Sequence, residues 1–152
     1  MASRRRKATG NRLVCPDGKR VSFSSEGAAD TTIRVMVVED HDGLRRLLSE
    51  LIDQQPDLET VAQAGSLGEA RYQAFSRRCD VAVLDTGLPD GQGANLIGEV
   101  RELWPGCAVL MLCASMDHES LAKASEAGAE ETMDKLAPVE QIVEAIRHVG
   151  NP

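Results

Sequence analysis

The chain is poor in aromatic residues and contains no long apolar run. Only 3% of its 152 residues are aromatic while 42% are hydrophobic, so a core must be built mainly from aliphatic side chains. No stretch approaches the roughly 18 consecutive apolar residues of a membrane-spanning helix. No apolar segment of the kind found in secretory signals follows the basic N-terminal residues. We therefore expect a cytoplasmic protein with no membrane partner.

The four cysteines do not form a metal-binding or redox motif. There is no CxxC pair and no cluster of cysteine with histidine. In a chain without an export signal, cysteines of this kind are expected to be free thiols. They are Cys15, Cys79, Cys107 and Cys113.

The net charge of −7 is distributed unevenly along the chain. Residues 1–32 hold seven basic and three acidic residues, for +4, and the remainder holds ten basic and 21 acidic residues, for −11. The first segment has no sustained hydrophobic period and is expected to be a disordered basic tail. The rest is too acidic for a nucleic-acid-binding surface, so direct binding of DNA or RNA by this chain is not expected.

From residue 33 the hydrophobic pattern alternates regularly between the period of a strand and the period of a helix. Alternating strands and helices predict parallel strands joined by right-handed crossovers, with helices on both faces. The expected fold is therefore a five-stranded doubly wound parallel sheet over residues 33–150. The expected strands are 33–38, 58–64, 81–84, 107–113 and 130–134, and the expected helices are 44–52, 66–78, 94–104, 117–126 and 138–149.

Chemically interesting side chains follow four of these strands. The carboxyl ends of parallel strands meet at one edge of the sheet, which is where ligands bind in such folds. Glu39 and Asp40 follow the first strand and Asp85 the third, Cys113 is the last residue of the fourth, and Lys135 follows the fifth. Three carboxylates at one edge repel one another unless a cation is present. Oxygen ligands of this kind suit Mg²⁺.

The same set of residues suits phosphoryl transfer. A metal ion lowers the negative field around Asp85, which lets this carboxylate attack an electron-poor phosphorus as a nucleophile. Lys135 supplies a compact positive charge that can hold a phosphoryl oxygen. Positioning and charge neutralisation carry most of the catalysis in reactions of this type.

Four stretches together resemble the receiver domain of bacterial two-component response regulators. The resemblance covers residues 33–150 and is closest to receivers that usually precede a helix-turn-helix output domain. It implies a flavodoxin-like fold. The stretches are Val35-Met36-Val37-Val38-Glu39-Asp40-His41, Asp85-Thr86-Gly87-Leu88-Pro89-Asp90-Gly91-Gln92-Gly93, Ala127-Gly128-Ala129 and Lys135.

The resemblance implies a mechanism and partners. A histidine kinase would donate a phosphoryl group to Asp85, in a self-catalysed transfer that turns over no small molecule. Mg²⁺ would be bound by Glu39 or Asp40, by Asp85 and by the backbone carbonyl of Gly87. Lys135 would bridge to the phosphoryl group. The phosphorylated domain would signal through altered contacts with a downstream protein partner.

Two switch positions depart from the family pattern. Cys113 stands where the family usually has Thr or Ser, and Thr132 stands where it usually has an aromatic residue. A thiol is a weaker hydrogen-bond donor than a hydroxyl. One alternative is therefore a degenerate receiver that binds a partner without phosphorylation. Cys113 itself is expected to be a small core residue, with a redox-sensitive thiol as the alternative.

Two further possibilities concern the whole protein. The chain is also consistent with the receiver part of a DNA-binding transcription regulator whose output domain is absent. A homodimer is possible through Thr132 and the face of the last helix, 138–149.

Overall fold

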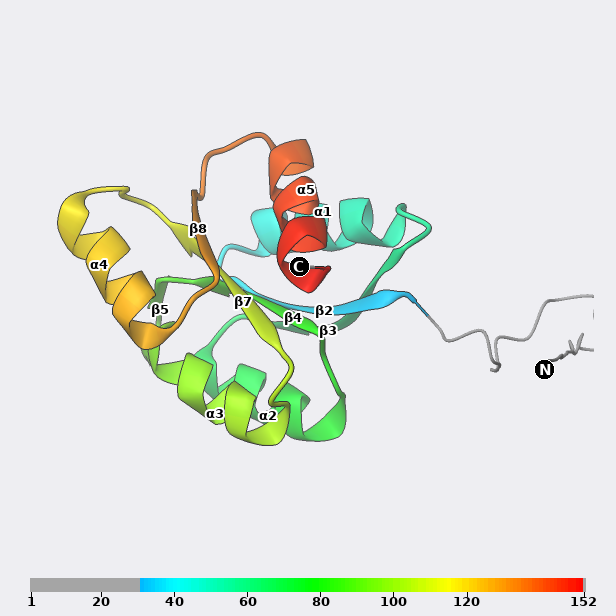
Figure 1. Ribbon diagram of the computed structural model, residues 1–152, viewed down its shortest axis with the longest axis horizontal. Helices are drawn as coiled ribbons and strands as arrows, with labels where there is room; N and C mark the ends of the chain where they lie inside the picture. Colours follow the sequence, from blue (N-terminus) through cyan, green and yellow to red (C-terminus); the bar gives the residue numbers. More distant parts are fainter. Residues whose placement is uncertain (1–30, 152) are drawn as a thin grey trace, which may run out of the picture. The chain divides into compact units, whose positions relative to one another are not determined.

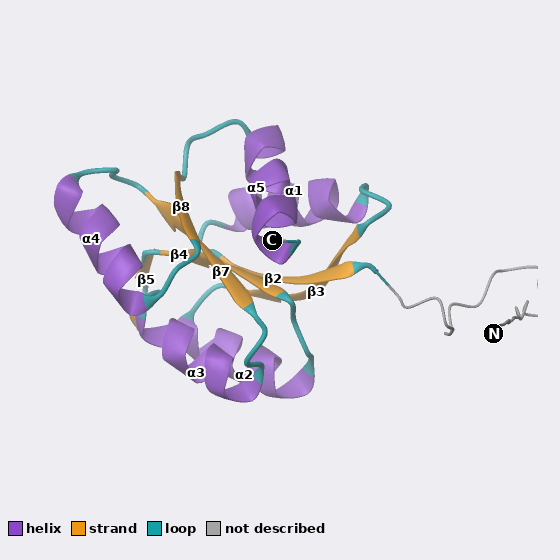
Figure 2. Cartoon of the chain, viewed as in Figure 1, coloured by secondary structure: helices purple, strands orange, loops and turns teal. Residues whose placement is uncertain are grey.

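Successive residues of the central strands point to opposite faces of one sheet, and each face is covered by its own set of helices. The computed structural model describes residues 31–151, and the chain from Ile33 onward forms one compact unit. Five parallel strands lie in the order β3-β2-β4-β7-β8. Figure 2 shows helices on both sides of this sheet.

The elements follow one another as five strand–helix units with one short insertion. The sheet strands are β2 (Ile33–Val38), β3 (Leu58–Ala64), β4 (Val81–Asp85), β7 (Ala108–Cys113) and β8 (Glu131–Asp134). The helices are α1 (Asp42–Asp53), α2 (Leu67–Ser76), α3 (Asn95–Leu103), α4 (His118–Ala127) and α5 (Val139–Gly150). The insertion is a small antiparallel pair, β5 (Gly87–Leu88) and β6 (Gly91–Gln92).

Two aliphatic clusters hold the layers together. On one face, Val37 of β2 and Val83 of β4 pack with α1 and α5. On the other face, Val38 and Leu84 pack with α2, α3 and part of α4. Figure 1 shows the first helix pair on one side of the sheet and α2 with α3 on the other. Because side chains along a strand alternate between the two faces of the sheet, neighbouring residues of one strand pack in both layers.

The predicted doubly wound sheet is confirmed, as are the signals that begin and end its helices. Ser66 is the N-cap of α2 and accepts a hydrogen bond from the backbone N–H of Glu69, 3.1 Å away. Asp117 caps α4 in the same way, through the N–H of Ser120. Gly128 ends α4 in the left-handed conformation, with φ of 104°, which favours glycine.

One feature differs from what the sequence predicted. The β5–β6 pair was expected only as a tight loop, because two-residue strands give no hydrophobic period. The tail predicted at residues 1–32 lies almost entirely outside the residues that the structure describes. Within residues 31–151, no helix is long and apolar enough to cross a bilayer.

Candidate functional site

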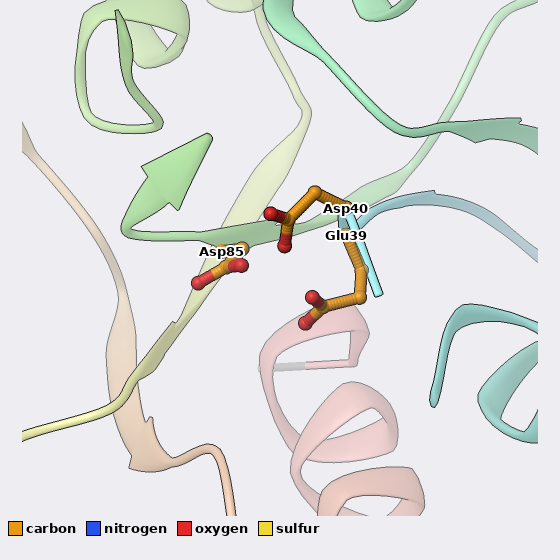
Figure 3. A group of neighbouring side chains, drawn as sticks. All are labelled: Glu39, Asp40 and Asp85. Carbon is orange, nitrogen blue, oxygen red and sulfur yellow. The ribbon is translucent and has the colours of Figure 1, made fainter. Parts of the chain in front are cut away.

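Neighbouring strands bring three carboxylates to the same edge of the sheet. Val38 of β2 pairs with Leu84 of β4, so Glu39 and Asp85 follow at equivalent positions. Asp40 is next along the chain. One carboxylate oxygen from each of the three residues lies within 4.8 Å of the others. Figure 3 shows the three side chains, Glu39 and Asp40 from the end of β2 and Asp85 from β4.

These carboxylates differ strongly in their access to water. Glu39 is fully buried and Asp85 is 2% exposed, whereas Asp40 is exposed. Two buried carboxylates side by side require a compensating positive charge, because an uncompensated buried charge is costly. The two buried carboxylates therefore need a positive charge or a bound proton beside them.

Lys135 supplies positive charge from the other side. Its Nζ lies 2.9 Å from Oδ2 of Asp85 and 3.0 Å from Oε2 of Glu39. Its backbone N–H donates to the carbonyl of Cys113, 2.8 Å away, which fixes the residue beside the end of β7. Lys135 follows β8 directly, and its side chain is 21% exposed. The lysine thus bridges the two buried carboxylates.

The electrostatics of the site shift several pKa values. Burial raises the pKa of Glu39 to about 7, against the lowering effect of the His41 backbone N–H and of Lys135. The neighbouring Glu39 carboxyl lowers the pKa of the exposed Asp40. Burial alone would lower the pKa of Lys135, but its bonds to Asp85 and Glu39 raise it overall. Near neutral pH, a bound proton would therefore compete with any metal ion for Glu39.

The loop after Asp85 is held close against the site. The N–H of Thr86 donates to the carbonyl of Leu112 at 3.1 Å, and the N–H of Gly93 returns to the carbonyl of Thr86 at 2.9 Å. A Cβ at Gly93 would lie 2.0 Å from the carbonyl oxygen of Asp85, so only glycine fits there. The exposed Gly87 directs its N–H toward Oδ1 of Asp85, at a long 3.4 Å.

The residues at this edge have the donors that a hard cation needs. Oε1 of Glu39 is buried and accepts no hydrogen bond from any residue in the described part of the chain. An unsatisfied buried carboxylate oxygen is costly, and a cation would satisfy it. The atoms that the three carboxylates offer to a metal are all oxygens, which suit a small divalent ion. The acidic cluster therefore fits a metal ion of the Mg²⁺ type.

The two unusual positions lie close by. Cys113 is buried at the end of β7 and pairs with Asp134 in the β7–β8 register. Burial first, and then the charges of Asp85, Asp117 and Asp134, raise the pKa of its thiol. This favours a protonated, packed side chain over a reactive thiolate. Thr132 is half-buried in β8, three residues before Lys135, and pairs with Met111.

Two residues near the start of α1 support Glu39, and of these Arg45 was not identified from the sequence. The Nη1 of Arg45 donates to the carbonyl of Glu39 at 2.7 Å, and the N–H of His41 donates to Oε2 of Glu39 at 3.0 Å. His41 is also the N-cap of α1. The sequence signal that could have identified Arg45 was its position in the first turn of the helix that follows the acidic pair.

Comparisons with known proteins agree with this geometry. Residues 35–147 match the family model of the response regulator receiver domain. The chain is 35% identical over 118 residues to the DNA-binding transcriptional activator DevR/DosR of Mycobacterium tuberculosis, which covers 78% of this chain and 54% of that protein. The chain thus spans about half the length of this curated relative.

Solved structures give the same result. A LuxR-family two-component response regulator from Aurantimonas sp. SI85-9A1 has a TM-score of 0.72 and 28% identity, over 78% of this chain and 85% of that one. The response regulator domain of Thermotoga maritima CheB has a TM-score of 0.71 and 25% identity, over 80% and 98%. The predicted family is confirmed, and the chain belongs to the response regulator receiver domains.

Proposed function

We propose that Asp85 is the phosphoacceptor of this receiver domain and that a histidine kinase is the donor. One observation carries the proposal. Buried Asp85 lies between two carboxylates that suit a divalent cation and a lysine whose Nζ is 2.9 Å away. A buried Asp with only a structural role would need the lysine, but it would not need two further carboxylates beside it.

The chemistry follows from the positions of the side chains. An Oδ of Asp85 attacks the phosphorus of a phosphohistidine and forms a P–O bond while the P–N bond breaks. The electron pair of the broken bond stays on the imidazole nitrogen, which takes up a proton. Lys135 Nζ, now bound to Asp85 and Glu39, transfers a hydrogen bond to a phosphoryl oxygen. This keeps the developing negative charge next to a fixed positive one.

Glu39, Asp40 and Asp85, with the carbonyl of Gly87, are the residues that would hold Mg²⁺. When bound, the ion neutralises negative charge on the transferring group. Without it, the incoming phosphoryl group meets three carboxylates and one lysine, which leaves the site repulsive. Phosphorylation should therefore require the metal.

The partners of the domain follow from its family. A kinase would dock beside the Asp85 edge, and the phosphorylated domain would change its contacts with a downstream protein. The DNA-binding activity named for the Mycobacterium relative belongs to a protein of which this chain covers only 54%. A separate output domain would supply such an activity, and the acidic receiver itself would not contact DNA. A cytoplasmic location suits both partners.

A small phosphodonor tests the proposal without a cognate kinase. Incubation with acetyl phosphate and Mg²⁺ should give an acid-stable, hydroxylamine-labile adduct, detected by intact mass. Asp85→Asn should abolish it. Asp117→Asn is the matched control, because Asn also caps helices and residue 117 lies at the same sheet edge.

The outcomes distinguish the two modes of action. An adduct that Asp85→Asn removes and Asp117→Asn keeps supports phosphoacceptance. Absence of any adduct over a wide range of Mg²⁺ concentration contradicts it and favours a receiver that binds its partner without phosphorylation. Replacing Cys113 by Thr then asks whether a hydroxyl at this buried position changes the lifetime of the adduct.

A further inference from the structure

Two buried cysteines, distant in sequence, lie against each other at the far edge of the sheet. The Sγ atoms of Cys79 and Cys107 are 3.5 Å apart, although the two residues are 28 positions apart in the sequence. Cys79 lies in the loop that enters β4, and Cys107 lies just before β7. They are 2% and 3% exposed.

The backbone around both cysteines is fixed by hydrogen bonds. The N–H of Ala108 donates to the carbonyl of Asp80 at 2.9 Å, which joins the two loops directly. The N–H of Cys107 donates to the carbonyl of Trp104, also at 2.9 Å, and Arg101 Nε donates to the carbonyl of Cys107. The two thiols therefore face each other in a defined geometry and do not meet by chance collision.

A small hollow lies beside the two cysteines. It has a volume of about 270 Å³ and is lined in part by Arg78, Cys79, Trp104, Pro105 and Cys107. A molecule the size of hydrogen peroxide can enter such a space. Neither thiol has a role in the chemistry at Asp85, which lies at the opposite end of β4.

We propose that Cys79 and Cys107 form a reversible disulfide when the protein meets a peroxide. One thiolate attacks a peroxide oxygen, the O–O bond breaks, and a sulfenic acid and water form. The second thiol then attacks the sulfenic sulfur and releases a second water. In total, two thiols and one hydrogen peroxide give one disulfide and two waters. A disulfide measures about 2.0 Å, so the sulfurs approach by roughly 1.5 Å.

The pair is expected to stay reduced under mild conditions. The hydrogen bond with Cys107, together with burial, raises the pKa of the Cys79 thiol above its ordinary value. The reactive thiolate is therefore scarce at neutral pH, and oxidation is slow compared with that of an exposed thiol. Once formed, the bond closes a loop that contains β4, the Asp85 loop and α3.

The test uses the full chain with Cys15→Ser, which leaves three thiols. The folded protein is treated with hydrogen peroxide, and N-ethylmaleimide is then added in denaturant. The number of N-ethylmaleimide adducts should fall from three to one. The mass of the protein itself should fall by two hydrogens. Dithiothreitol should restore three adducts. Peptide mapping should join Cys79 to Cys107. Thermal unfolding should shift upward by on the order of 10 °C in the oxidised form.

Matched variants separate this pair from general oxidation. Cys113→Ser, at another buried cysteine, should still lose two labels. In the Cys79→Ser and Cys107→Ser variants, no N-ethylmaleimide label should be lost to disulfide formation. Mapping in the parent protein does not depend on how the variants fold. Added oxygen on the thiols, a bond to Cys113, or a Cys79–Cys107 bond that forms only after denaturation would each overturn the proposal.

Discussion

Lys135 donates hydrogen bonds to two carboxylates that have almost no access to water. Its positive charge is therefore part of what keeps Glu39 and Asp85 tolerable in the folded state. Removing one partner of a buried ion pair costs more than the pair contributes, because the remaining charges stay buried. This asymmetry makes the lysine a sensitive probe of the site.

Lys135→Met should lower the free energy of unfolding by about 2 to 3 kcal/mol in EDTA. Saturating Mg²⁺ should restore part of the loss, because the ion replaces the missing positive charge. Urea unfolding at pH 7.5 measures both effects. Lys123→Met is the control, because Lys123 pairs with Glu119 on an exposed helix face and should cost less than about 0.5 kcal/mol. Equal losses for the two variants would contradict the buried role.

The raised pKa of Glu39 predicts how stability depends on pH without metal. With a pKa of about 7 in the folded state, Glu39 binds a proton more tightly there than in the unfolded chain, where the ordinary value is 4.5. Its stabilising contribution is thus complete below pH 4.5 and is lost as the pH rises toward 7. The slope is at most about 1.4 kcal/mol per pH unit for one proton.

Chemical unfolding in EDTA at pH values between 4.5 and 8 measures this dependence. Glu39→Gln should flatten the decline, because the amide does not titrate. Mg²⁺ should bind more weakly below pH 7 in the parent protein, since a proton then occupies its ligand. A decline that is the same in Glu39→Gln would assign the effect to another group.

At the scale of elements, the loop after β4 has very little room for an added side-chain atom. Gly93 lies between the β5–β6 pair and α3, and a Cβ added to it would lie 2.0 Å from the carbonyl oxygen of Asp85. Its contact is with backbone, which cannot rotate away as a side chain can. The position of the phosphoacceptor candidate is therefore coupled to the start of α3.

Gly93→Ala should destabilise the protein by about 3 kcal/mol, because the added Cβ forces the loop away from Asp85. It should also weaken Mg²⁺ binding. Gly98→Ala, inside α3 with nothing within 4 Å of the new Cβ, should instead stabilise by roughly 0.5 to 1 kcal/mol. Thermal unfolding of both variants checks the contrast. A mild effect at residue 93 would mean that the loop has an alternative path.

The element pattern explains what the sequence could and could not predict. Apolar runs such as Val81–Leu84 and caps such as Ser66 carry local signals, so the sheet and most helix starts were predictable. The acidic pair, Asp85 and Lys135 at the ends of the first, third and fifth strands of the sheet predicted the candidate site. The β5–β6 pair was not predictable, because strands of two residues give no hydrophobic period. The contact between Cys79 and Cys107 depends on the register of β4 with β7, which no local signal reveals.

At the scale of the whole molecule, a metal that binds only the folded state must stabilise it. At a Mg²⁺ concentration ten times the Kd, the gain should be about 1.4 kcal/mol. Thermal unfolding with MgCl₂, compared with NaCl at equal ionic strength, measures it. Asp40→Asn should reduce the gain, because it removes a carboxylate from the acidic cluster. An equal shift with NaCl would indicate general screening of the acidic surface.

The bond between Asp85 and Lys135 joins residues 50 positions apart, across β4 and the last strand of the sheet. Until β8 is in place, the two buried carboxylates lack their lysine and repel one another. A nascent chain, or a folding intermediate without β8, therefore has the phosphoacceptor candidate but no competent site. Reaction at Asp85 would then serve as a chemical reporter of completed folding, because only the finished sheet brings its partner into reach.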